Sequence, residues 1–188
     1  MALSNLSAAQ TVDLLFAGDL MQHQAQIDAA RTSSGYCYDS CFARVKQEIE
    51  RADLAVANLE VTFAGKPYRG YPQFSAPDEY LTAIKEAGFD VLLTANNHCL
   101  DGGSKGLERT LHMLDSADVV HAGTYRDAEE RIRRYPLVCE VRKGDWMEPS
   151  AVRVAFLNYT YGTNGLKVRE PQVVNYIDTV QIKQDIRR

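Results

Sequence analysis

Four short apolar runs of β-strand composition alternate along this chain with helical patterns, and this alternation restricts the fold more than any other feature. The strand-like runs cover residues 12–17, 54–57, 91–94 and 119–121. Helical patterns, with apolar residues spaced three and four apart, cover residues 40–52, 77–87 and 104–116. Because parallel neighbouring strands need a crossover connection, the order predicts an α/β protein whose parallel strands are covered by helices.

The pattern changes after residue 128. Residues 135–141 and 152–159 predict two strands joined by the polar turn 143–150, which indicates a hairpin and therefore a mixed sheet. Asp178 is the predicted N-cap of a last helix whose apolar face carries Ile182 and Ile186. That helix has no Gly or Pro stop before the chain ends, so residues 1–188 are expected to form a single but incomplete domain.

Chain length and net charge restrict the kinds of partner that this protein is expected to bind. A chain of 188 residues with 45% apolar content can bury one sizeable core. The net charge of −4 and a pI near 5.6 provide no general attraction to a polyanion, so nucleic acid is disfavoured as a partner. A small-molecule or polymer substrate is expected instead, and an anionic one would need a local cation.

The cysteine content and the N-terminal sequence indicate the cellular compartment in which the protein is expected. The four cysteines form no CxxC pair, so they are expected to be reduced thiols rather than zinc ligands. No signal peptide or membrane segment is recognisable. The chain as written is therefore expected to be cytoplasmic, or exported or anchored if an N-terminal segment was removed. An exposed sheet edge is expected to allow pairing between copies as a homo-oligomer.

Three of the strand-like runs end in polar residues. Asp19 follows the first, Asn58 and Glu60 end the second, and Asn97 and His98 follow the third. The carboxyl ends of parallel strands meet at one sheet edge, where ligands bind in open α/β folds. Carboxylate and amide oxygens are ligands of divalent cations, so these residues predict a metal centre. The alternative is that each residue only caps a helix or turn, which would require three coincidences.

His98 and Asp101 are the predicted catalytic pair. An amide oxygen of Asn97 could coordinate a cation while the imidazole of His98, oriented by Asp101, donates a proton to a leaving oxygen. Such a site suits hydrolysis of a phosphoester. The alternative for an isolated Asn-Asn-His sequence is an ordinary turn.

Further segments are expected near this edge or on the surface. Residues 61–76 form either a solvated loop or a substrate-facing flap with cationic and aromatic groups. Residues 159–165 are a candidate further wall of the site, and residues 126–134 are predicted to be an exposed helix face. His23 is either a ligand or a surface residue, and His121 is expected to be structural.

Three motifs in series, GDLM (18–21), NLE (58–60) and ANNHCLDGG (95–103), resemble the CapA family, which is named for poly-γ-glutamate capsule biosynthesis and is similar to calcineurin-like metallophosphatases. The resemblance covers most of the chain. It implies the N-terminal portion of a layered α/β/β/α sandwich and a phosphoesterase-like site with a divalent metal, Mn, Mg, Zn or Fe. By position, it implies metal ligands at Asp19, Asn97 and either Glu60 or Asn58, and His98 with Asp101 as the pair that assists the transition state.

The motifs also depart from ordinary metallophosphatases. Met21 stands where their Asp-x-His motif has its histidine, and Glu60 replaces the usual aspartate. The later His-rich ligands of the family have no counterpart in this chain, which would thus hold about half a site and bind metal weakly. Two functions follow: a metal-dependent hydrolase of surface polymer biosynthesis, or a non-catalytic binding or assembly protein that keeps the fold.

Overall fold

The computed structural model describes residues 11–143 and 150–188. Its elements are, in chain order, β1 Leu14–Leu20, α1 Gln24–Ala29, α2 Lys46–Arg51, β2 Leu54–Leu59, α3 Asp78–Glu86, β3 Val91–Leu93, α4 Gly103–Ser116, β4 Val120–Ala122, β5 Thr124–Tyr125, α5 Ala128–Arg134, β6 Leu137–Lys143, β7 Ser150–Phe156, β8 Val173–Val174 and α6 Thr179–Ile186. The predicted turn at 143–150 lies mostly outside the described residues.

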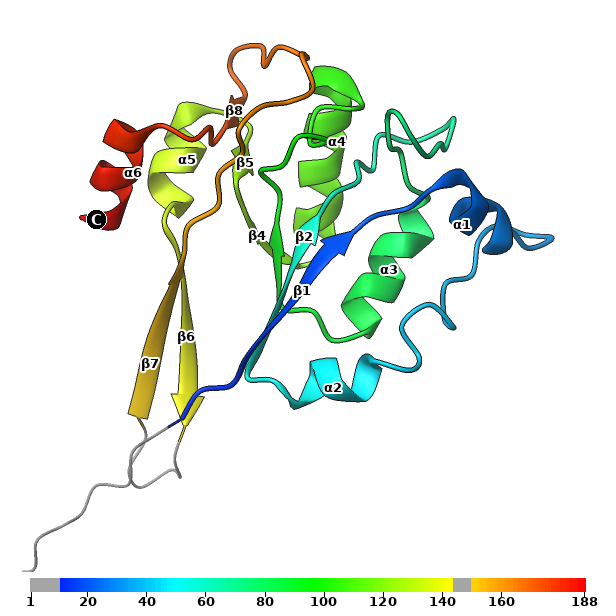
Figure 1. Cartoon of the computed structure of the whole chain (residues 1–188), viewed down its shortest axis with the longest axis horizontal. Coiled ribbons are helices and arrows are strands. Elements are labelled where there is room, and N and C mark those ends of the chain that lie inside the picture. Colours follow the sequence, from blue (N-terminus) through cyan, green and yellow to red (C-terminus); the bar gives the residue numbers. More distant parts are fainter. Residues whose placement is uncertain (1–10, 144–149) are drawn as a thin grey trace, which may run out of the picture.

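The centre of the fold is a four-stranded parallel sheet in the order β1-β2-β3-β4 (Figure 1). Alternate residues of β2 face opposite layers, as the period of a strand requires. Ala55 and Ala57 pack with Leu81 of α3, whereas Val56 packs with Phe156 of the β6–β7 hairpin. The described residues therefore form helix, sheet and hairpin layers, and the predicted α/β class is confirmed.

The antiparallel strands do not extend the central sheet. β6 pairs with β7, and β5 with β8, as separate two-stranded sheets. The predicted hairpin is confirmed, but it stacks on the sheet through its apolar face instead of joining it. β1 is an edge strand, and Phe16 on it is 62% exposed. The expected exposed edge is thus present in the described residues, while pairing between copies stays a prediction.

The first predicted helix is shorter than its pattern. α2 begins only at Lys46, and Val45 before it is 49% exposed. Phe42 lies in a preceding turn, where it packs edge-on against Phe89 at 6.0 Å between ring centroids and beside Tyr80 at 6.1 Å. Of the apolar residues that predicted a helix over 40–52, Ile49 is a buried residue of α2, whereas Phe42 packs against aromatic rings from a non-helical segment. α3 and α4 match their predicted ranges closely.

The last helix docks through a carboxylate rather than through apolar residues. Asp178 is its N-cap, as predicted, and accepts hydrogen bonds from the backbone N–H groups of Val180 and Gln181 at 2.8 and 2.9 Å. The predicted apolar face is wrong, because Ile186 is 64% exposed and Asp185 is fully buried. Arg131 of α5 holds that carboxylate with a bond of 2.6 Å. This buried ion pair determines which face of α6 packs against the rest of the protein.

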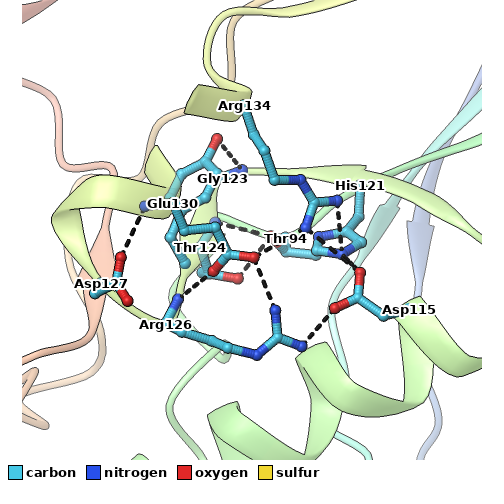
Figure 2. A network of polar contacts seen from close by, with 10 residues as sticks. Thr94, Asp115, His121, Gly123, Thr124, Arg126, Asp127, Glu130 and Arg134 are labelled. Atoms are coloured by element: carbon cyan, nitrogen blue, oxygen red, sulfur yellow. Dashed lines mark hydrogen bonds and ion pairs between the residues drawn. The ribbon is translucent and has the colours of Figure 1, made fainter. Parts of the chain in front are cut away.

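A network of charged side chains ties α5 to α4 and β4 (Figure 2). Glu130 accepts bonds from Arg126 at 2.8 Å and Arg134 at 3.0 Å, and its side chain is only 6% exposed. Asp115 of α4 accepts from Arg126 and lies 3.1 Å from Nε2 of buried His121. The prediction that residues 126–134 are merely an exposed helix face is therefore wrong, whereas His121 takes the structural position expected for it.

The described cysteines are all free thiols. No helix in the described ranges is both long and apolar enough to cross a membrane.

Candidate functional site

The carboxyl ends of β1 and β2 bring two acidic side chains together around one amide. Asp19 pairs in register with Asn58, directly after an irregularity in β1 at which Gly18 has a φ of +80°. Glycine adopts this left-handed conformation at little cost, which lets the strand re-aim the next side chain. The Nδ2 of Asn58 donates to Asp19 Oδ1 and to Glu60 Oε2, both at 2.9 Å.

Glu60 lies in an environment that disfavours its charged form. Burial raises the pKa of Glu60, and the charge of nearby Asp19 raises it further. Asp19 is exposed, whereas the Glu60 side chain is only 13% exposed. Two acidic groups that repel each other at a strand end form a donor set that a divalent cation would stabilise. The residues present thus fit a cation, although the described chain contains no group of three His, Cys, Asp or Glu residues placed to hold one.

Asn96 links the carboxylate pair to the histidine and was missed by sequence reasoning. Its Nδ2 donates to Asn58 Oδ1 at 3.1 Å and to the Leu59 carbonyl at 2.8 Å. Its Oδ1 accepts from the backbone N–H of His98 at 3.0 Å. The sequence contains adjacent asparagines at 96 and 97, and only the backbone direction after β3 decides which of them turns toward β2.

His98 is held by Asp101 and faces the carboxylate pair. Its Nδ1 lies 2.8 Å from Asp101 Oδ2, which also accepts the backbone N–H of Phe74 at 2.6 Å. Because the Asp101 carboxylate only accepts hydrogen bonds, its bond with His98 requires a proton on Nδ1 of the imidazole. The opposite nitrogen, Nε2, lies 4.0 Å from Glu60 Oε1. Burial raises the pKa of Asp101, against the hydrogen bonds from Phe74 and His98.

The side chain of Asn97 contacts a loop far along the chain. Its Nδ2 donates to Asn164 Oδ1 at 3.3 Å, and Asn164 Nδ2 lies 3.4 Å from His98 Nδ1. Asn164 itself has a φ of +50°, an uncommon backbone conformation for a residue other than glycine. The segment 159–165 therefore reaches the site, as its sequence suggested.

A hollow opens beside His98 between three loops. We call it the amide hollow, and it is lined by Tyr71, Gln73, Asn97, His98, Asn164 and Leu166, among others. The loop 61–76 thus contributes a wall of the site through Tyr71 and Gln73, while Lys66 and Arg69, which are cationic residues of the same loop, do not line it.

His23 is an exposed residue at the N-cap of α1. Its backbone N–H donates to Gln26 Oε1 at 2.8 Å at the start of α1. Its ring packs edge-on against Phe74 at 5.4 Å, and Phe74 packs edge-on against His98 at 4.7 Å. Of the two alternatives, His23 therefore takes the position of a surface residue, with its ring against Phe74.

Comparison with known proteins places the chain in a family. Residues 13–188 match the family described as "Bacterial capsule synthesis protein PGA_cap". The chain is 30% identical over 131 residues to "Capsule biosynthesis protein CapA" of Bacillus anthracis, which is 66% of this chain and 29% of that protein. It is also 30% identical over 90 residues to the uncharacterized proteins y4sH and y4uA of Sinorhizobium fredii, covering 44% of this chain and 20% of each.

The aligned part of the chain spans less than a third of the length of these relatives. The family match, by contrast, runs through all three strand ends that form the site and through the loop that carries Asn164. The chain belongs to the CapA family of bacterial capsule synthesis proteins.

Proposed function

We propose that this chain carries the cation-binding and proton-transfer groups of a metal-dependent, phosphoesterase-like hydrolase that acts in the biosynthesis of capsule or a related surface polymer. One observation carries the proposal: the Nε2 of His98 faces Glu60 at 4.0 Å while Asp101 holds the other ring nitrogen at 2.8 Å. A histidine fixed in this way is oriented for proton transfer at the edge where the carboxylates converge.

Asp19 and Glu60 are the proposed cation ligands. A divalent cation bound there would polarise the scissile bond and lower the pKa of a bound water. Asn58 directs its amide nitrogen at both carboxylates, so in this arrangement it holds them in place. Asn97, the other asparagine with a ligand role implied by the family motif, faces Asn164.

His98 is the proposed proton donor to the leaving group. Asp101 fixes the ring through Nδ1, so that the proton given up belongs to Nε2 in the imidazolium form. Asn96 positions the segment by accepting the backbone N–H of His98 and donating toward Asn58. The hydrolytic step therefore depends on a chain of contacts that runs from Asp101 through His98 to Glu60.

One observation favours the second candidate, a non-catalytic binding or assembly protein. Met21, which occupies the histidine position of the metallophosphatase motif, packs against the main hydrophobic core as a partly buried side chain. The side chain at this position therefore packs against the core and does not supply a metal ligand. A bound cation would have to be held by the carboxylates.

Hydrolysis of p-nitrophenyl phosphate separates the two candidates. We expect turnover with Mn²⁺ that a chelator abolishes and added Mn²⁺ restores, because the proposed ligands are carboxylates that exchange their cation with solvent. Absorbance at saturating Mn²⁺, with and without EDTA, measures it. A chain that binds Mn²⁺ but gives no turnover above buffer would favour the binding protein over the enzyme.

A further inference from the structure

The side-chain amide of Asn96 is held in one orientation by two backbone groups. Its Nδ2 donates to the Leu59 carbonyl at 2.8 Å, and its Oδ1 accepts the backbone N–H of His98 at 3.0 Å. A carbonyl can only accept a hydrogen bond and an N–H group can only donate one, so exchanging the two ends of the amide would break both bonds. Asn96 is buried, with 7% exposure, so bonds to solvent would not replace them. The backbone therefore fixes this amide.

Asn96 in turn fixes the side-chain amide of Asn58. The Nδ2 of Asn96 lies 3.1 Å from Asn58, and because Nδ2 is a donor, the Asn58 atom that it contacts must be the acceptor Oδ1. The other end of the Asn58 amide, Nδ2, is thereby turned toward the two acidic side chains, and it donates to Asp19 and to Glu60 at 2.9 Å each. Asn96 and Asn58 thus form a relay from the backbone to the two carboxylates, which we call the asparagine relay.

The asparagine relay sets Asn58 against the role of a cation ligand. Hydrogen bonds to ionised carboxylates are stronger than bonds between neutral groups, so the NH₂ group stabilises the two like charges that converge on it. The atom of the Asn58 side chain that could coordinate a cation is Oδ1, and Oδ1 faces Asn96. If the amide turned over to present Oδ1 to a cation, the NH₂ group of Asn58 would meet the NH₂ group of Asn96, donor against donor.

We propose that Asn96 is a positioning residue that makes Asn58 compete with a divalent cation for Asp19 and Glu60 instead of binding the cation itself. The asparagine relay then sets how tightly the two carboxylates hold a cation, and the same Asn96 side chain ties this setting to the backbone of His98. The inference rests on the proposed function, because it concerns the proposed cation ligands. The orientation of the Asn58 amide can nevertheless be measured without metal and without substrate.

Glu60→Gln, followed by NMR without metal, tests the asparagine relay. Because the NH₂ group of Asn58 donates to Glu60, replacing that carboxylate by a neutral amide should shift the side-chain ¹⁵N and ¹H signals of Asn58 in the ¹⁵N-labelled chain. Asn96→Asp should remove this response. The aspartate keeps an oxygen for the N–H of His98 but has no donor for Asn58, so the Asn58 amide should turn its NH₂ group toward the new carboxylate.

Asn97→Asp is the matched control. It adds the same charge at the adjacent residue, whose side chain contacts Asn164. In this background Glu60→Gln should still shift the Asn58 signals. A merely structural role of Asn96 would lower the stability of Asn96→Asp without changing the response of the Asn58 amide to Glu60→Gln.

Calorimetric titration with Mn²⁺ measures the competition itself. Asn58→Asp replaces the competing NH₂ group by a third carboxylate, to which Asn96 can still donate. This variant should bind Mn²⁺ about tenfold more tightly than the wild type does.

The proposal is overturned if Glu60→Gln leaves the Asn58 signals unmoved in the wild type, or moves them equally in Asn96→Asp. It is also overturned if a wild-type chain that binds Mn²⁺ binds it as tightly as Asn58→Asp does. The expected NMR responses in a chain that binds no Mn²⁺ would support the asparagine relay and contradict the hydrolase proposal, so the two failures can be distinguished.

Discussion

Replacing His98 by alanine is expected to lower Mn²⁺-dependent hydrolysis of p-nitrophenyl phosphate by roughly 10²- to 10⁴-fold, the usual contribution of a positioned general acid. The substitution removes the only imidazole that faces Glu60 in the described chain. It leaves the Asp19, Asn58 and Glu60 contacts intact, so Mn²⁺ affinity should change little. Initial rates and Mn²⁺ titrations of both proteins measure the two effects.

His112→Ala is the matched control for this experiment. His112 is an exposed histidine of α4, away from the strand ends, and its loss should leave the rate unchanged. The hydrolysis rate of Asp101→Asn should lie between the rates of His98→Ala and His112→Ala, because an asparagine can still contact the ring but favours the wrong tautomer. Full turnover in His98→Ala would show that the proton comes from elsewhere.

Asp185→Ala is expected to lower the free energy of unfolding by about 3–5 kcal/mol, the typical cost of removing one partner from a buried ion pair. Asp185 is fully buried and accepts bonds from Arg131 at 2.6 Å and from the Tyr159 hydroxyl at 2.8 Å. Without it, the guanidinium of Arg131, whose side chain is only 11% exposed, keeps its burial and loses its counterion. Urea denaturation followed by circular dichroism measures the change.

Glu48→Ala provides the comparison for an exposed pair. Glu48 and Arg51 contact each other at 3.0 Å on the surface of α2, with side chains more than 60% exposed. Removing such a pair should cost less than about 1 kcal/mol. Similar losses in both variants would mean that α6 does not depend on its buried carboxylate for docking.

The convergence of Asp19, Glu60 and His98 could be predicted because parallel strands must end at the same edge. Apolar runs followed by polar residues are visible in the sequence, and crossover helices fix the strand direction. Asn96 could not be chosen over Asn97 in this way. Neighbouring side chains point in different directions, so the course of the backbone determines which of the two adjacent asparagines faces Asn58.

Long-range contacts account for what the sequence did not predict. Asn164 lies 66 residues after His98, in a loop whose course depends on the packing of β5 against β8. The inward face of α6 was predicted from its apolar residues, but Arg131 of another helix selects Asp185 instead. Likewise, the arginines of the charged run at α5 can contact Asp115 only once α4 and α5 are packed together.

Paramagnetic broadening by Mn²⁺ tests the central claim, that Asp19 and Glu60 hold a cation beside His98, more directly than any rate. In the ¹⁵N-labelled chain, small additions of Mn²⁺ should broaden the signals of Asn58, Asn96 and His98 first. Signals of α2 should remain sharp, because this helix lies at the opposite end of β2 (Figure 1).

Glu60→Gln should abolish the selective broadening, since it removes one of two proposed carboxylate ligands and keeps the bond from Asn58. Selective loss of the three signals in the wild type and none in the variant is the result we predict. Uniform broadening, or broadening at the strand ends that Glu60→Gln leaves unchanged, would contradict it.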